Sequence, residues 1–370
     1  MHEENQDHVS NPLPAAEAEK VALAKGTPWF KKINPTWIII AVFLLLIIIG
    51  FSIYKGISQQ GQQKTQSAKV YRVGVLAGLN FFLGTIDGFK EGMETLGYVE
   101  GENIVYIIEK TPTPVGNEAV IQKFVDQKVD LILTFPTEPS LEAKKVTEGT
   151  NIPVIFTNAG LDGVNLIDSI QKPGANITGV QFPTADTAVQ RLEIIHEIAP
   201  KAKNVWVTYL KDYPIVPEEL RRLKPAAESM GITIIEVPAT TLDDVKADLE
   251  KREKSASLGI DAIIFIPEPL TAAPEAYTLI GNFATKHKLP LGGTLFEDGV
   301  DGSLFGYTPD SVEVGKQAAI LADKIFKGTP AGTIPVISAE NYLVINYKVA
   351  QKNGLTISEA LLSRARKIIR

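Results

Sequence analysis

The alternation of short apolar runs with amphipathic helical patterns is the feature that most constrains this chain, and it begins at residues 71–101. An apolar run over residues 73–77 ends at Gly78 and predicts a strand buried on both faces. A helix is predicted next, because apolar residues follow at spacings of 4, 3, 4 and 3: Phe82, Ile86, Phe89, Met93 and Leu96. Gly97 ends this helix, since glycine readily adopts the positive φ found after helices. This strand–loop–helix unit is typical of a doubly wound α/β domain, which binds ligands beyond the carboxyl ends of its strands.

The same alternation continues in two successive runs. Strands are predicted at residues 103–109, 130–134, 153–157 and 176–181, and then at 204–209, 232–237, 260–266, 289–292, 303–307 and 342–346. Helices are predicted between most of them, among them residues 141–148 and 220–230. Each run is long enough for a parallel sheet of its own. We expect the tail from residue 303 to complete both sheets, so that the chain crosses between two lobes more than twice and forms a hinge.

We therefore predict two doubly wound parallel-sheet lobes joined by a hinge. The predicted N-terminal lobe comprises residues 70–182 and about 304–333. The predicted C-terminal lobe comprises residues 183–303 and about 334–370.

An apolar segment precedes these lobes. Residues 37–54 contain no charge in 18 positions, which as a helix span roughly 27 Å, close to the thickness of a bilayer core. We predict a single, uncleaved transmembrane anchor; the alternatives are a buried core helix and a cleaved signal peptide. Residues 1–36 are expected to be a disordered cytoplasmic segment, and residues 55–69 a flexible tether. The folded lobes would then be extracytoplasmic, in the periplasm or outside the cell.

Composition excludes several functions. The net charge is −6 and no basic tract stands out, so we expect no nucleic-acid partner. The absence of cysteine excludes disulfides, thiolate metal sites, a cysteine nucleophile and a lipid-modified cysteine. The four histidines are scattered, and no phosphate loop, dinucleotide fingerprint, nucleophile elbow or zinc-protease motif is present. We therefore predict no catalytic residue, no metal and no cofactor.

The candidate ligand contacts are residues that follow the predicted strands. Polar residues there are Asn80, Thr137, Thr157, Asn158, Tyr209, Glu268, Thr294 and Glu297. Leu79, Phe81 and Tyr307 complete the eleven candidates, and two more aromatic residues, Phe135 and Phe296, lie nearby. Such a mixture suits a small polar or amino-acid-like molecule. Taken singly, each residue is also explained as a turn former or a core side chain, so the prediction depends on their shared position at one edge.

Three stretches carry a family pattern: YRVGVLAG with DGFKEGMETLGYVEGENI, PVIFTN with KPGANITGV, and the tail GTIPV with NYLVINYKVAQKNGLTISEALLSRARKII. They resemble the ABC transporter substrate-binding protein family related to tryptophan- and tyrosine-binding proteins, over about residues 70–370. The resemblance implies a type I periplasmic-binding fold, no catalysis, and a membrane permease with its ATPase as partner. It places ligand loops at residues 79–81, Thr137, Thr157, Asn158, the loop after Tyr209, Glu268 and Glu297.

The chain departs from the family pattern at two of these loops. Many members carry Gly-Asp-Pro after the fourth strand, where this chain has Asn158-Ala159-Gly160. Many also have small residues after the third strand, where this chain has residues 135–139, FPTEP. We predict a membrane-tethered solute-binding protein of an ABC importer. The alternative is a ligand-sensing extracytoplasmic domain that signals to a membrane partner, although the chain contains no kinase or receiver domain.

Overall fold

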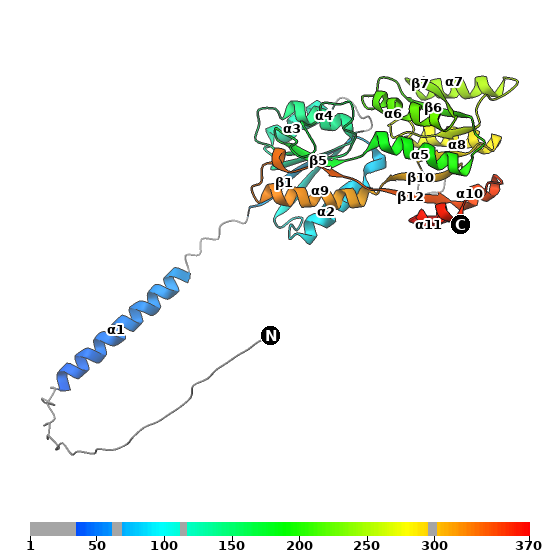
Figure 1. The fold of residues 1–370 in the computed structure, drawn as a ribbon. Coiled ribbons are helices and arrows are strands. Elements are labelled where there is room, and N and C mark those ends of the chain that lie inside the picture. Colours follow the sequence, from blue (N-terminus) through cyan, green and yellow to red (C-terminus); the bar gives the residue numbers. More distant parts are fainter. Residues whose placement is uncertain (1–34, 61–68, 112–116, 295–301) are drawn as a thin grey trace, which may run out of the picture. The chain divides into compact units, whose positions relative to one another are not determined.

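The computed structural model of the chain describes residues 35–60, 69–111, 117–294 and 302–370 (Figure 1). It divides into two compact units, residues 1–67 and residues 68–370. In the first unit, α1 (Pro35–Gln60) is a helix of 26 residues. Within the part of the chain that is described, no helix combines the length and the apolar character that crossing a membrane requires. The transmembrane anchor at residues 37–54 stays a prediction.

The second unit contains two lobes, and the first is built on a six-stranded parallel sheet with the order β11-β5-β4-β3-β1-β2. Its strands are β1 (Tyr71–Ala77), β2 (Ile104–Lys110), β3 (Leu131–Phe135), β4 (Val154–Ala159), β5 (Ile177–Gln181) and β11 (Ile337–Ser338). Its helical segments are η1 (Asn80–Phe82), α2 (Gly84–Thr95), α3 (Glu118–Asp126), α4 (Thr137–Val146), α9 (Ser311–Phe326) and η2 (Ala331–Thr333).

The second lobe is built on a seven-stranded sheet with the order β13-β12-β10-β9-β8-β6-β7. Its strands are β6 (Asn204–Leu210), β7 (Thr233–Ala239), β8 (Ala262–Ile264), β9 (Leu291–Gly293), β10 (Ser303–Pro309), β12 (Asn341–Asn346) and β13 (Lys367–Ile369). Its helices are α5 (Thr184–Ile198), α6 (Val216–Ser229), α7 (Leu242–Glu253), α8 (Pro274–His287), α10 (Tyr347–Lys352) and α11 (Glu359–Arg364).

The α/β class with two sheets is confirmed, but the second sheet is only mostly parallel. Strand β12 pairs with β10 in the antiparallel sense. The path of the chain explains this, because β10 leaves the second sheet at its carboxyl end toward the first lobe, and β12 returns from that side. It must therefore run opposite to β10.

The chain crosses between the lobes three times, and two crossings lie later than the sequence predicted. The first falls between Gln181 and Thr184, close to the predicted boundary at residues 182 and 183. The second follows Pro309 rather than residue 303, because β10 pairs with β9 and β12 in the second sheet. The third follows Ser338 rather than residue 333, because β11 pairs with β5 in the first sheet.

Two helices begin earlier than their apolar pattern predicted. Helix α4 was expected from residue 141 but begins at Thr137, so Thr137 and Glu138 lie in its first turn. Pro139 follows them, and proline is tolerated there because the first turn of a helix leaves its N–H groups unpaired anyway. Helix α6 was expected from residue 220 but begins at Val216. Its first turn contains Pro217, which is tolerated there in the same way.

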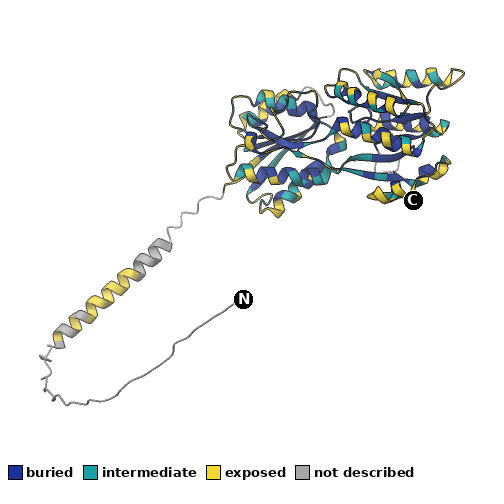
Figure 2. Ribbon diagram, viewed as in Figure 1, coloured by how far each residue is buried: buried dark blue, intermediate teal, exposed yellow. Residues whose placement is uncertain are grey.

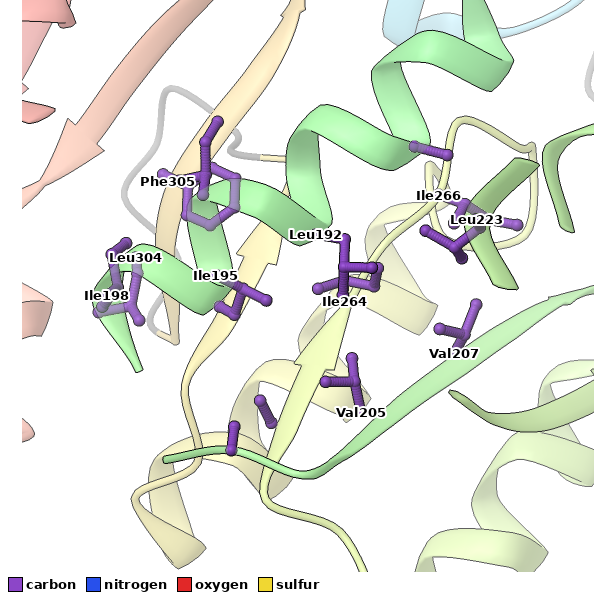
Figure 3. Close-up of a cluster of buried hydrophobic side chains, with 14 of the residues drawn as sticks. Leu192, Ile195, Ile198, Val205, Val207, Leu223, Ile264, Ile266, Leu304 and Phe305 are labelled. Carbon is purple, nitrogen blue, oxygen red and sulfur yellow. The ribbon is translucent and has the colours of Figure 1, made fainter. Parts of the chain in front are cut away.

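Apolar side chains pack the sheets against their helices, and the inward faces of the elements are buried (Figure 2). In the second lobe, Leu192 and Ile195 of α5 lie against Val205, Val207 and strand β8 (Figure 3). Burial of this kind is the main favourable contribution to folding, roughly 25 cal/mol for each Å² of apolar surface removed from water. The packed cores hold the strand ends in place, and it is these ends that form the site.

Candidate ligand-binding site

The two lobes meet where the winding direction of each sheet reverses. In the first sheet, β1 and β3 are neighbours, and the Gly78 N–H donates to the Phe135 carbonyl oxygen at 2.8 Å. In the second sheet, β6 and β8 are neighbours, and the Leu210 N–H donates to Glu268 Oε2 at 2.9 Å. Ligands of doubly wound folds bind at such points, where successive loops diverge to opposite sides of the sheet.

A small cavity of about 30 Å³ lies at this meeting point and takes its walls from both lobes. From the first lobe and the linker after β5 come Leu79, Phe81, Phe82, Pro136, Thr137, Asn158 and Phe182. From the second come Thr184, Arg191, Tyr213, Ile215, Ile266, Pro267, Glu268, Pro269, Ala272, Thr294 and Thr308. The volume holds only about two water molecules, so a larger ligand enters only if the lobes move apart.

The structure brings six of the eleven predicted contact residues together in the cavity wall: Leu79, Phe81, Thr137, Asn158, Glu268 and Thr294. Four others lie elsewhere. Asn80 is exposed, and Thr157 is buried in β4, where its hydroxyl donates to the Thr134 carbonyl oxygen. Tyr209 donates to Glu236 within the second lobe, and the backbone carbonyl of Tyr307 accepts from Arg191. Glu297 lies outside the described residues.

Asn158 presents an unpartnered acceptor to the cavity. It lies at the end of β4 with φ 51, at a register shift between β4 and β5. Asparagine tolerates this left-handed conformation better than most residues. Its Nδ2 donates to Thr85 Oγ1 at 2.9 Å, while its buried Oδ1 has no hydrogen-bond partner among the described residues. An unpaired buried acceptor is costly, so this oxygen is suited to a donor on a ligand.

Arg191 is a cavity residue that the sequence prediction missed. It lies on α5, is 2% exposed, and donates from Nε to the Tyr307 carbonyl and from Nη1 to the Phe265 carbonyl, both at 2.9 Å. Burial lowers the pKa of this guanidinium to about 9, which leaves it charged at neutral pH. A signal existed in the sequence, because Arg191 falls on the apolar face of α5 with Ala188, Leu192 and Ile195.

Glu138 and Tyr213 join the two lobes beside the cavity. The Tyr213 hydroxyl, from the segment between β6 and α6, donates to Glu138 Oε2 on α4 at 2.7 Å. Both side chains are buried, and Glu138 Oε1 has no partner among the described residues. Burial, with a smaller contribution from the nearby Glu142, raises the pKa of the Glu138 carboxyl to about 8. The bond exists only while the lobes are together.

Glu268 has a role in its own loop. Its Oε2 accepts from the N–H groups of Leu210 and Leu270, and its Oε1 accepts from the Thr271 N–H at 2.6 Å. These bonds fix the loop after β8 against the end of β6. The predicted contact residue Glu268 therefore lines the cavity while its carboxylate oxygens are engaged by backbone donors.

A larger hollow, of about 1100 Å³, lies at the opposite edge of the first sheet. Its walls include the starts of β1 and β4 and the end of α9, with Tyr71, Pro153 and Phe326 among them. This is the amino end of the parallel strands, where doubly wound folds do not place ligands. The cavity between the lobes is therefore the candidate site. Among the described residues, no group of three or more His, Asp or Glu side chains is arranged to hold a metal ion.

Two α/β lobes with a polar cavity between their strand ends define a periplasmic-type binding protein. The sequence profile of the ABC transporter substrate binding protein family matches residues 80–369, and the chain belongs to this family. The family consists of the substrate-binding proteins of transporters and is not an enzyme family. A search of curated protein sequences found no significant match.

Several solved structures share the fold. A conserved domain protein from Vibrio cholerae is 27% identical, with a TM-score of 0.71 over 81% of this chain and 100% of that chain. An ABC domain from Streptococcus pneumonia in complex with L-tryptophan is 21% identical, with a TM-score of 0.71 over 81% and 100%. A solute-binding protein from Agrobacterium vitis bound with α-D-tagatopyranose is 16% identical, with a TM-score of 0.59 over 80% and 99%. The predicted type I periplasmic-binding fold is confirmed by these neighbours.

Proposed function

We propose that this protein is the membrane-tethered, extracytoplasmic solute-binding protein of an ABC importer. It binds a small polar or amino-acid-like ligand between its lobes, closes on it, and presents the closed form to a membrane permease that is driven by an ATPase. The family and the fold support the transport role. The amino-acid-like character of the ligand goes beyond what the family and the fold support and is part of our proposal.

The observation that carries the proposal is the composition of the cavity between the lobes. One buried guanidinium and buried oxygens without partners line it, among them Asn158 Oδ1 and Thr308 Oγ1. Apolar and aromatic side chains, including Phe81 and Phe182, form the rest of the wall. A few convergent polar groups in an apolar wall are typical of a site for a small molecule.

The test of ligand binding uses the full chain purified in detergent. The protein is denatured mildly and the released small molecules are identified by mass spectrometry. We expect one compound in near-stoichiometric amount, and we expect its addition to stripped protein to raise the melting temperature, because a ligand that binds only the folded state stabilises it. If no compound is released and a broad metabolite panel causes no thermal shift, the solute-binding role is wrong.

The tether is supported by the 18 uncharged residues at 37–54 and by the exposure of Phe43, Leu46 and Ile49 on α1. Side chains of this kind favour hydrocarbon over water. We expect the expressed chain to resist extraction of membranes with alkaline carbonate, and externally added protease to reach residues 69–370 in intact spheroplasts. Release into the carbonate supernatant, or protection from protease, would contradict this part of the proposal.

A further inference from the structure

The hydrogen bond between the lobes buries an acidic side chain of the first lobe against the second. The Tyr213 hydroxyl donates to Glu138 Oε2 at 2.7 Å, and both side chains are buried. Glu138 lies in the first turn of α4, next to the cavity residue Thr137. Water therefore reaches Glu138 when the second lobe moves away, and closing of the lobes transfers its carboxyl group from water into a buried environment.

No positive charge accompanies Glu138 into this environment. Among the described residues, no Lys, Arg or His side chain forms an ion pair with it. The two basic residues of α4 are engaged elsewhere: Lys145 pairs with Glu118 of α3, and Lys144 donates to the Asn165 carbonyl oxygen. A buried carboxylate without a cation is strongly unfavourable, whereas a neutral carboxyl group with a hydrogen bond costs much less.

The other charged groups around the Glu138–Tyr213 bond are mostly acidic. Those that act on Glu138 or on Tyr213 are Glu142 of α4 and the buried Glu219 and Glu268 of the second lobe. Arg191 acts on Glu219, which also bonds the Thr184 hydroxyl, but it is not among the groups that act on Glu138. Burial above all, and Glu142 to a smaller degree, favour the protonated form of Glu138 and raise its pKa to about 8.

The open arrangement favours the ionised form of the same group. Glu138 is then exposed at the start of a helix, where the free N–H groups and the dipole favour a negative charge. Its pKa is then no higher than the ordinary value near 4.5. Between roughly pH 4.5 and pH 8, Glu138 is therefore neutral in the closed form and ionised in the open form.

We propose that closing of the lobes takes up one proton at Glu138, so that the protein binds its solute more weakly as the pH rises. This rests on the proposed solute-binding function. The proton comes from the solvent: an O–H bond forms at the Glu138 carboxyl group as the lobes close and breaks as they open. The neutral carboxyl group still accepts the hydrogen bond of Tyr213, so the bond between the lobes and the proton are gained together.

Energy transfer between two dyes, one on each lobe, measures this equilibrium in single molecules without any solute. The chain has no cysteine, so dyes attach only to introduced ones, Gln127→Cys in the first lobe and Lys246→Cys on α7 of the second. Both positions are exposed. The full chain is studied in detergent from pH 5 to pH 9. Salt is kept constant, because the ion pair of Arg222 with Asp162 also spans the lobes and is screened by salt.

We expect the ratio of closed to open molecules to fall as the pH rises. The fall should be up to about 10-fold for each pH unit between roughly pH 5 and pH 8, because the closed form holds one proton more than the open form. The ratio should be level above about pH 8, where Glu138 is ionised in both forms.

Variants then assign the pH dependence to Glu138. We expect Glu138→Gln to keep a constant ratio from pH 5 to pH 9, because its amide is neutral in both forms and still accepts from Tyr213. Glu148→Gln is the matched control, since Glu148 is exposed just after the same helix, and it should keep the wild-type slope. Should Glu138→Gln fail to fold, Glu138→Ala takes its place, because it also removes the titrating group.

The outcomes separate this inference from the function on which it rests. A ratio that stays constant in the wild type, or that falls equally in the wild type and in Glu138→Gln, shows that proton uptake at Glu138 is wrong. The solute-binding function stands in that case if a released compound raises the melting temperature of stripped protein. If no compound is released and none of the metabolite panel causes a thermal shift, the solute-binding function is wrong, and the coupling of solute binding to the proton is wrong with it.

Discussion

Glu138 is an acidic side chain in the first turn of α4 that is only 8% exposed to solvent. Burial disfavours the charged form of this carboxyl group. The hydrogen bond that its own backbone N–H donates at the start of the helix favours the charged form, but more weakly. Its pKa rises to about 8 in the folded protein, from an ordinary value near 4.5. Glu138 therefore holds a proton at neutral pH when the protein is folded and releases it when the chain unfolds.

Glu138 makes the free energy of unfolding depend on pH. Between roughly pH 4.5 and pH 8 the folded protein holds a proton that the unfolded chain lacks, so stability falls as the pH rises through this window and is level above it. The slope for one proton is at most about 1.4 kcal/mol per pH unit. We expect Glu138→Gln to flatten this dependence, measured by urea unfolding of the unit 68–370 from pH 5 to pH 9.

The exposed residue Glu148, which follows the same helix, provides the control. Glu148→Gln should leave the slope as it is in the wild type. Buried Glu219 and Glu268 also have raised pKa values and contribute in the same direction, so only the difference between wild type and Glu138→Gln reports on Glu138. Equal slopes for the wild type and Glu138→Gln would show that Glu138 is ionised in the folded protein.

At the scale of single residues, the sequence predicted which residues lie at the cavity better than it predicted which side chains contact each other. Thr137, Asn158 and Glu268 could be predicted at the cavity because each follows a strand, and the carboxyl ends of parallel strands lie at one edge. Arg191 and Tyr213 lie on a helix and in a loop of the second lobe. Arg191 contacts Phe265, 74 residues away in the sequence, and Tyr213 contacts Glu138, 75 residues away. A pattern of neighbouring residues cannot predict contacts over such sequence separations.

At the scale of elements, α2 and α9 pack at unusually close range. Gly88 of α2 faces the backbone of Val312, and a Cβ at position 88 would lie 1.9 Å from the Val312 carbonyl oxygen. Gly315 of α9 faces α2 in the same way, with its Cβ position 2.2 Å from the Thr85 carbonyl oxygen. Glycine at these positions lets the two backbones touch. The contact joins α2, which follows the first strand of the lobe, to α9, which follows the crossing from the second lobe.

This contact predicts different effects for two glycines of one helix. Gly88→Ala should destabilise the protein by about 3 kcal/mol, because overpacking moves the helices apart. Gly84→Ala should be neutral or slightly stabilising, because a Cβ there would lie 3.4 Å from Ser311 Cβ, an ordinary contact, and alanine favours the helix. Urea unfolding of both variants measures the difference. Equal stabilities would contradict the close packing of α2 on α9.

The elements themselves were largely predictable, and the exceptions have physical causes. The local pattern of apolar residues predicts the alternation of strands and helices, because these apolar residues are the ones that the cores bury. Strands β11 and β13 are only two and three residues long. Strand β11 forms where the chain runs alongside β5 and pairs with it, and β13 forms alongside β12 in the same way. Pairing of this kind depends on the tertiary fold, so a local pattern does not indicate it.

At the scale of the whole unit 68–370, three crossings join the lobes, and a hydrogen bond between two buried side chains, Tyr213 and Glu138, spans them beside the cavity. The crossings let the lobes move apart about short linkers. The bond from Tyr213 to Glu138 forms only in the closed arrangement. It therefore contributes to the equilibrium between closed and open forms, and a ligand that prefers the closed form is bound more weakly when that form is less populated.

Tyr213→Phe should shift this equilibrium toward the open form. The change removes one hydroxyl and leaves Glu138 without the partner of its Oε2, while its Oε1 already has none among the described residues. An unsatisfied buried group costs about 1–3 kcal/mol, so ligand affinity should fall by about 5- to 150-fold. Small-angle X-ray scattering of ligand-free protein should show a larger radius of gyration than in the wild type.

Tyr209→Phe is the matched control for this last prediction. The Tyr209 hydroxyl donates to Glu236 Oε2 at 3.0 Å, and both residues belong to the second lobe, on β6 and β7. Its loss removes the same chemical group without touching the contact between lobes. It should therefore lower the melting temperature modestly, while the radius of gyration and the affinity stay as in the wild type. If Tyr213→Phe behaves like Tyr209→Phe in scattering and in binding, the hydroxyl of Tyr213 stabilises only its own loop, and closure depends on the ligand and on the remaining contacts between the lobes, among them the ion pair of Arg222 with Asp162.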